Sequence, residues 1–220
     1  MADGLYSYFK QHFRLISCDS EYQTVAGDMP HVLCFVYRDI VTGETWRCEN
    51  KEDILKLPFD NRNTCYLVFN AVAESKAWLA WGITLPEYII DLWIEAKNIS
   101  QTGSGTYKGF NSMLSVARRF KVPEEFIMLD NEKETMRDLI LENESWSNQE
   151  WRSIIDYCEK DTILTGKLLV PICNAIQQKF SDRQLLHIAQ QILCRGLAKA
   201  YEGLIYQNGI PMHLESYNKY

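Results

Sequence analysis

Two acidic residues, separated by one residue, stand at the end of the first predicted strand, FRLISCD. Successive side chains of a strand alternate between its faces, so Asp19 and Glu21 point to the same side. Neighbouring carboxylates repel each other unless a cation lies between them, and oxygen ligands of this kind suit Mg²⁺ or Mn²⁺. A solvated turn is the alternative interpretation, because a second D-x-E pair occurs at Asp130 and Glu132.

A tyrosine and an aspartate stand four residues apart in the segment YCEKD. Tyr157 and Asp161 share one face of a predicted helix, about one turn apart. At this spacing the carboxylate can hold a metal ion while the phenol orients a water molecule. Ile154 and Leu164 lie on the same face and turn it partly inward. An exposed i,i+4 pair is the alternative interpretation.

A further acid follows the apolar run TCYLVF. Asn70 and Glu74 stand where a predicted strand runs into a helix, with Glu74 in the first helical turn. An acid at this position commonly does no more than offset the helix dipole. The functional interpretation is a fourth acid of a metal site, contributed from a separate part of the chain.

These residues need a scaffold that brings distant segments together. Apolar runs predict strands at 13–19, 31–40 and 44–49, and their short connections predict an antiparallel meander. A strand at 64–70, a helix ended by Gly82 and a strand at 88–93 follow. The sequence therefore predicts an α/β protein with a mixed five-stranded sheet.

Helical patterns dominate after the glycine-rich segment GSGTYKG at 103–109. In the helix predicted at 148–172, apolar residues recur near the 3.6-residue period, so one face packs on the core. The last segment is interpreted as a helical appendage that begins near Ser181 and ends at Gly209. The predicted helices of this half cover about 110–120, 132–143, 148–172 and 181–206.

The order of the three motifs is more specific than any one of them. D-x-E on the first strand, N-x-x-x-E after the fourth and Y-x-x-x-D on a late helix resemble the DEDD exonucleases of the ribonuclease H-like fold, in the subtype with tyrosine in the third motif. Within that group the chain is similar to the 3′→5′ proofreading domain of family A DNA polymerases, particularly those of phage type. The resemblance covers about residues 12–175 and implies a ribonuclease H-like fold.

Residues 195–212, RGLAKAYEGLIYQNGIPM, resemble the segment that joins this domain to the polymerase body in phage enzymes. The resemblance therefore implies an exonuclease domain over residues 1–175 and, over 176–220, a helical appendage like the start of a polymerase connection. It also implies a polymerase domain in cis or in trans, or a free-standing relative, and the host cytoplasm as the location if a phage encodes the protein.

The resemblance further implies hydrolysis assisted by two divalent ions, Mg²⁺ or Mn²⁺. Their ligands would be Asp19, Glu21, Glu74 and Asp161, with Asp19 as the bridge, and Tyr157 would orient the attacking hydroxide. The expected reaction releases nucleoside 5′-monophosphates from the 3′ end of single-stranded DNA.

Two positions depart from the family's second motif. Phe69 stands where histidine usually precedes the asparagine, and Ala73 stands where an aromatic residue usually precedes the acid. Glu74 is one methylene longer than the commoner aspartate, and Mg²⁺ tolerates little distortion. Two alternatives therefore stay open: a ribonuclease of the same fold, and a catalytically silent module that binds nucleic acid or a partner protein.

Binding a single strand requires aromatic faces and positive charge. Tyr22 directly follows the D-x-E pair and can stack on the terminal base, and Asn70 is a further candidate contact. Basic residues around the glycine-rich segment can contact phosphates, although a solvated helix face is the alternative. These basic residues are Lys108, Arg118, Arg119 and Lys121.

The composition limits the remaining possibilities. The 220 residues carry a formal net charge of −6 and are 46% hydrophobic, which is typical of a globular protein. A negative chain repels a polyanion, so a nucleic-acid partner requires a local basic patch or metal ions. No apolar run of about 18 residues predicts a membrane span. Seven scattered cysteines without a C-x-x-C pair predict reduced core residues of a cytoplasmic protein, and four histidines without metal spacing leave carboxylates as the metal ligands.

Overall fold

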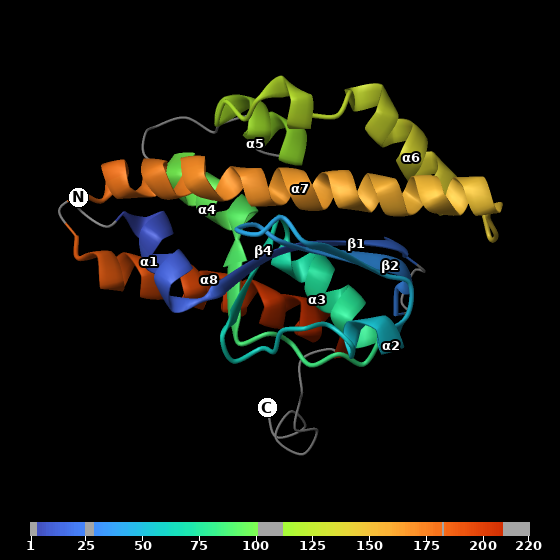
Figure 1. The fold of residues 1–220 in the computed structure, drawn as a ribbon, viewed down its shortest axis with the longest axis horizontal. Helices are drawn as coiled ribbons and strands as arrows, with labels where there is room; N and C mark the ends of the chain where they lie inside the picture. The colour runs from blue at the N-terminus through green and yellow to red at the C-terminus, as the bar shows by residue number, and fades with distance from the viewer. Residues whose placement is uncertain (1–3, 25–28, 101–111, 182, 209–220) are drawn as a thin grey trace, which may run out of the picture.

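The computed structural model describes residues 4–24, 29–100, 112–181 and 183–208, which fold into a sheet covered by helices (Figure 1). The elements are, in chain order, α1 (Leu5–His12), β1 (Arg14–Gln23), β2 (His31–Asp39), β3 (Thr45–Cys48), α2 (Lys51–Ile54), β4 (Thr64–Val68), α3 (Ala71–Ala80), β5 (Tyr88–Asp91), α4 (Leu92–Ser100), α5 (Met113–Arg119), a 3₁₀ helix (Glu124–Phe126), α6 (Asp130–Glu142), α7 (Asn148–Lys179) and α8 (Leu185–Asn208).

The five strands form one mixed sheet in the order β3-β2-β1-β4-β5. β1, β2 and β3 pair antiparallel, whereas β4 pairs parallel with both β1 and β5. Every residue of β4 is buried, as expected for a central strand that is covered on both faces. The mixed five-stranded α/β sheet predicted from the sequence is thereby confirmed.

The first strand is longer than the sequence pattern predicted. β1 runs from Arg14 to Gln23 and is paired with β2 from Ile16 to Gln23, with a register shift between Glu21 and Tyr22. Its pairing with β4 ends at Ser17. The prediction that the strand stops at residue 19 was wrong, because pairing with β2 continues through the polar segment. Asp19 and Glu21 consequently lie on an ordered strand that extends beyond the carboxyl end of its parallel neighbour.

Helices cover both faces of the sheet, as Figure 1 shows, with α7 on one side and α3 and α8 on the other. Alternation along the strands divides the core in the same way: Leu15 joins the cluster that contains α7, and Ile16 joins the cluster that contains Trp78 of α3. A third cluster packs Ile154 of α7 against β2. The carboxyl end of β1 therefore lies between α7, on one face of the sheet, and the start of α3, on the other.

The helix α7 extends beyond the predicted end at residue 172. A capping box of Ser147 and Glu150 begins it, and it continues to Lys179 with Pro171 in its interior. Proline in a helix interior normally breaks the helix, because it lacks the backbone N–H that would donate to the preceding turn. Here Ile172 and Ile176 remain buried, so packing of the apolar face outweighs the lost hydrogen bond. The helix therefore runs through residue 175, where the sequence placed a domain boundary.

The helix α8 packs directly on the sheet and on α3. Glycine at two positions permits the contact, because a Cβ atom at Gly196 would overlap the carbonyl oxygen of Ile89, and one at Gly203 would overlap the hydroxyl of Ser75. Arg195 binds both oxygens of the buried Glu95 carboxylate at 2.7 and 2.8 Å. The helix begins at Leu185 rather than near Ser181, and its predicted end at Gly209 lies outside the described residues.

The remaining differences concern short elements with weak sequence signals. The helices α1 and α2 form in segments for which the sequence predicted no element. The strand predicted at 88–93 consists of β5 and the beginning of α4. α4 begins at Leu92 because the carboxylate of Asp91 accepts hydrogen bonds from the backbone amides of Trp93 and Ile94, both at 3.0 Å.

Six of the seven cysteines are buried, Cys194 is exposed, and all are free thiols. The buried six agree with the core role expected from the sequence. Among the described helices, none combines the length and the apolar character that crossing a bilayer requires.

The close approach of α8 can be tested by filling the space at Gly196. We expect Gly196→Val to lower the free energy of unfolding by about 3 kcal/mol or more, because the rigid backbone at Ile89 must move. Ala198→Val on the exposed face of the same helix is the control and should cost about 0.5 kcal/mol. Urea unfolding measures both variants, and equal losses would contradict the packing described here.

Candidate active site

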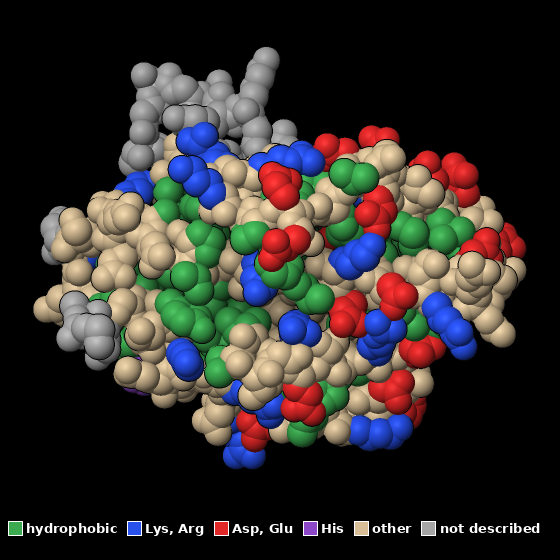
Figure 2. Space-filling view, turned by 45° about the horizontal axis from the view of Figure 1, so that its top comes forward, with side chains coloured by type: hydrophobic (Ala, Val, Ile, Leu, Met, Phe, Trp, Pro, Cys, Tyr) green, Lys and Arg blue, Asp and Glu red, His purple; other side chains and the backbone are tan. Residues whose placement is uncertain are grey.

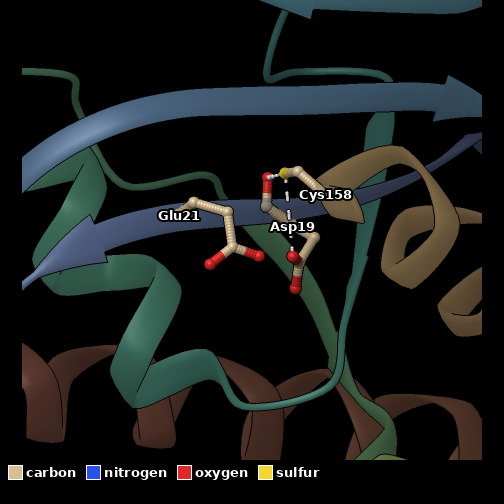
Figure 3. A group of neighbouring side chains, drawn as sticks. All are labelled: Asp19, Glu21 and Cys158. Carbon is tan, nitrogen blue, oxygen red and sulfur yellow. Dashed lines mark hydrogen bonds between the residues drawn. The ribbon is translucent and has the colours of Figure 1, made fainter. Parts of the chain in front are cut away.

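Two carboxylates of β1 form the centre of the site. Figure 3 shows Asp19 and Glu21 pointing to the same side of the strand, with Cys158 of α7 beside them. A carboxylate oxygen of each acid and the sulfur of Cys158 all lie within 4.8 Å of one another. The Cys158 thiol donates to the backbone oxygen of Asp19 at 3.3 Å, which fastens the strand to α7. The alternation of side chains predicted from the sequence is observed.

The third carboxylate reaches the strand from the other layer. Glu74 lies in the first turn of α3, is only 4% exposed, and accepts a 2.6 Å hydrogen bond from the hydroxyl of Ser20. This bond ties the start of α3 to β1, and the charge of Asp19 raises the pKa of Glu74, so the Glu74 and Asp19 carboxylates lie close together. An acid that served only to offset the helix dipole would remain in solvent.

The start of α3 is held in an unusual way. Asn70 occupies the N-cap position, yet its side chain caps nothing, and its amide oxygen is buried without a partner. The carboxylate of Asp91 instead accepts a hydrogen bond from the backbone amide of Ala71 at 3.0 Å. Burial raises the pKa of Asp91 to about 6, against the effect of these backbone donors. The amide of Asn70 is therefore left for a contact within the site.

The fourth carboxylate and the tyrosine come from α7. Tyr157 and Asp161 are 7% and 3% exposed, so this face of the helix is buried rather than solvated. Lys133 of α6 donates to Oδ2 of Asp161 at 2.8 Å, whereas Oδ1 is buried and has no hydrogen-bond partner. A buried carboxylate oxygen without a partner is costly, which points to a ligand for this atom.

All five residues line one pocket of about 640 Å³ at the carboxyl end of β1. Ligand sites commonly occupy this edge in sheets with parallel strands. Apolar side chains, including Phe69 and Met113, share the lining with the acids. The residues that the sequence motifs identified and the structure brings together are Asp19, Glu21, Glu74, Tyr157 and Asp161.

The acids oppose one another electrostatically. Burial raises the pKa values of Asp19, Glu21 and Glu74 well above the ordinary range, and the charges of neighbouring acids raise them further. Burial also raises the pKa of Asp161, although the ammonium of Lys133 acts in the opposite direction. Four carboxylates that repel one another in a pocket form a site for cations.

The donor set fits divalent ions that prefer oxygen. Four carboxylates from the three elements β1, α3 and α7 converge in the pocket. One of their oxygens, Oδ1 of Asp161, is buried without a hydrogen-bond partner. Cys158 is the sulfur donor nearest to the acids, and its thiol already binds the backbone of β1. The residues that would hold the ions are Asp19, Glu21, Glu74 and Asp161.

The candidate substrate contacts fall into two groups. Tyr22 and Asn70 line the pocket. Arg118 instead pairs with Asp130 at 3.0 Å, and neither it nor Arg119 or Lys121 is among the described residues of the pocket lining. Lys108 lies outside the described residues. The second D-x-E pair also has a structural role, since Asp130 binds Arg118 and Glu132 binds Lys160.

The sequence reasoning missed the basic residues that do line the pocket. Lys133 and Arg137 stand four residues apart on α6, and both belong to the lining. Gln23 holds this helix in place by donating to the backbone oxygens of Ile140 and Asn143 at 2.7 and 2.6 Å. The i,i+4 spacing of the two cations was visible in the sequence, but the contact between α6 and β1 was not. In Figure 2, acidic and basic side chains are interspersed over the right-hand half of the view.

The pH dependence of stability should report the repulsion among the acids. Groups whose pKa is raised by folding stabilise the protein below their unfolded pKa of about 4 and lose this contribution as the pH rises through the folded values. Asp19→Asn removes one of these groups. Without metal, the melting temperature of the variant minus that of the wild type should therefore increase as the pH rises from 4 to 8. Asp138→Asn, an exposed acid on α6, is the control. A constant difference across this pH range would contradict the electrostatic description.

Comparisons with known proteins identify the fold. No protein-family model matches the chain, and no curated protein matches it. Among solved structures, the chain is similar to Escherichia coli RNase D, an exoribonuclease involved in structured RNA processing, with a TM-score of 0.53 and 16% identity over 94% of this chain. The chain spans 49% of the length of that protein.

Two further structures have TM-scores of 0.44. They are the EXO domain of Aedes aegypti Nibbler, at 10% identity with 86% of this chain and 91% of that one covered, and the catalytic core of Trypanosoma brucei RRP6, at 12% identity with 89% and 51% covered. At 16% identity, the similarity to RNase D shows that the chain has the α/β fold of that protein, which agrees with the ribonuclease H-like fold expected from the motifs.

Proposed function

We propose that this protein is a metal-dependent 3′→5′ exonuclease that acts on single-stranded nucleic acid and releases nucleoside 5′-monophosphates. The observation that carries the proposal is the convergence of four carboxylates and a buried tyrosine in one pocket. Gathering these acids in one pocket is electrostatically unfavourable, because the charge of Asp161 raises the pKa of Asp19 and the charges of both raise the pKa of Glu74. Binding of cations and a phosphodiester explains the arrangement.

Each residue has a distinct task in the proposed reaction. Asp19, Glu21, Glu74 and Asp161 would hold the metal ions, with Asp19 at the centre of the group. When bound, two divalent ions activate a water molecule and stabilise the leaving oxygen. Tyr157 stays protonated because burial raises its pKa, so its hydroxyl can orient the attacking water. Tyr22 and Phe69 supply aromatic faces to the pocket for the terminal bases.

The sugar of the substrate is the open part of the proposal. The sequence motifs resemble those of DNA proofreading domains, whereas RNase D, with a TM-score of 0.53, is an exoribonuclease. This similarity supports RNA as the second candidate substrate. The proofreading role, the polymerase domain in cis or in trans and the cytoplasmic location are predictions that rest on the sequence.

Hydrolysis of matched oligonucleotides tests the assignment. With Mg²⁺ and a 5′-labelled single strand, made once as DNA and once as RNA, we expect shortening from the 3′ end. Asp19→Ala should reduce the rate by at least about 10³-fold, because it removes the central ligand. Tyr157→Phe should reduce it less, by about 10²-fold, because the ligands remain.

Asp156→Ala and Tyr201→Phe serve as controls, because both residues are exposed outside the pocket. They should keep wild-type rates. Full activity in Asp19→Ala would remove the proposed function. Metal binding without hydrolysis of either oligonucleotide would identify the silent binding module instead, and the ratio of the DNA and RNA rates would show the preferred sugar.

Arg137 provides a separate test of how the substrate is held. Its guanidinium group is exposed at the pocket, where an anionic strand must pass. We expect Arg137→Gln to raise the KM for a single strand by about tenfold at low salt with little change in kcat, because a phosphate contact acts mainly in binding. Arg152→Gln, an exposed arginine of α7 outside the pocket lining, should leave KM unchanged. A loss confined to kcat would contradict this role.

A further inference from the structure

Lys133 is placed differently from the other charged residues of α6. Its ammonium group enters the acidic pocket and lies 2.8 Å from Oδ2 of Asp161, whose side chain is only 5% exposed. Among the described residues, Asp161 is the only one of the four proposed metal ligands that forms an ion pair. Of the two basic residues in the pocket lining, Lys133 is therefore the one that pairs with a proposed metal ligand, whereas Arg137 is exposed.

The field of this ammonium extends beyond its hydrogen-bond partner. Burial lowers the pKa of Lys133, but the charges of Asp161, Asp19 and Glu21 outweigh burial and raise it. Lys133 is consequently a full positive charge that interacts with three of the acids. A divalent ion bound to the same acids would neutralise the same charges.

We propose that Lys133 is an internal counter-ion that occupies the cation position beside Asp161 in the metal-free protein, and that a divalent ion binds there by displacing it. This inference rests on the proposed metal site. It means that Lys133 lowers the affinity of that site for a divalent ion. The Lys133 ammonium and the divalent ion compete because both bind the carboxylate of Asp161 and their positive charges repel each other.

The structure allows Lys133 to leave without moving its helix. The backbone of α6 is held by Gln23 through Ile140 and Asn143, and Glu132 of the same helix pairs with Lys160 of α7. The Lys133 side chain is 30% exposed and joins the helix through a flexible chain of methylene groups, so the ammonium can turn toward solvent at low cost.

Two adjacent ion pairs between α6 and α7 provide a matched experiment. Lys133 pairs with Asp161 inside the pocket, and Lys160 pairs with Glu132 outside it. Lys133→Met and Lys160→Met both remove one lysine charge from the same helix interface. Binding of Mn²⁺ to each full-length protein is measured by titration calorimetry, and the melting temperature is measured with and without Mn²⁺.

We expect Lys133→Met to bind Mn²⁺ at least about tenfold more tightly than the wild type, because the competing charge is absent. Its metal-free form should melt at a lower temperature, and saturating Mn²⁺ should raise that temperature by more than in the wild type. Lys160→Met should bind Mn²⁺ with the affinity of the wild type.

Three results would overturn the inference. Equal Mn²⁺ affinity in Lys133→Met and the wild type would show that the lysine does not compete, and the metal site would stand without it. Weaker binding in Lys133→Met would show that the lysine orients Asp161 for the ion instead. Absence of Mn²⁺ binding in both proteins would remove the proposed metal site, and with it the counter-ion.

Discussion

Mutual repulsion among carboxylates gathered in one pocket is the constraint around which this structure is arranged. Asp19, Glu21, Glu74 and Asp161 share one pocket, and burial and their neighbours raise the pKa of each. Protonation, the hydroxyl of Ser20 and the ammonium of Lys133 relieve part of this repulsion without any ligand. The remaining repulsion therefore lowers the stability of the folded protein, and bound divalent ions would raise it again.

The scaffold must resist this repulsion, and it does so from three directions. β1 remains paired with β2 past the end of β4, so the strand carrying two of the acids cannot fray. Asp91 fixes the start of α3, and Val72 and Ser75 of α3 lie close to Gly203 of α8. The long apolar face of α7 places Tyr157 and Asp161 on the pocket from the other layer. Packing far from the site thus holds together groups that repel each other.

The sequence predicts those parts of the site that depend on local periodicity. Alternation along a strand placed Asp19 and Glu21 on one face, and the helical period placed Tyr157 one turn from Asp161. The five-stranded sheet followed from apolar runs and short turns. Residues 19–23 could not be assigned to the strand from their polar side chains, since pairing with β2 orders them.

Long-range contacts account for what the sequence could not supply. Lys133 and Arg137 resemble any solvated pair of helix charges until the hydrogen bonds of Gln23 bring α6 against β1. Arg118 looked equally suitable as a phosphate contact, but it pairs with Asp130 outside the pocket lining. Similarly, the close approaches of Gly196 to Ile89 and of Gly203 to Ser75, which the sequence alone does not show, pack α8 against the sheet and α3.

The most direct test of the central claim is a crystal of the protein soaked in Mn²⁺ and measured at a wavelength where manganese scatters anomalously. The account predicts two anomalous peaks about 3.5 to 4 Å apart among Asp19, Glu21, Glu74 and Asp161, the separation found in two-metal sites. The ammonium of Lys133 should then have moved away from Asp161. A pocket without anomalous density at saturating Mn²⁺ would contradict the account.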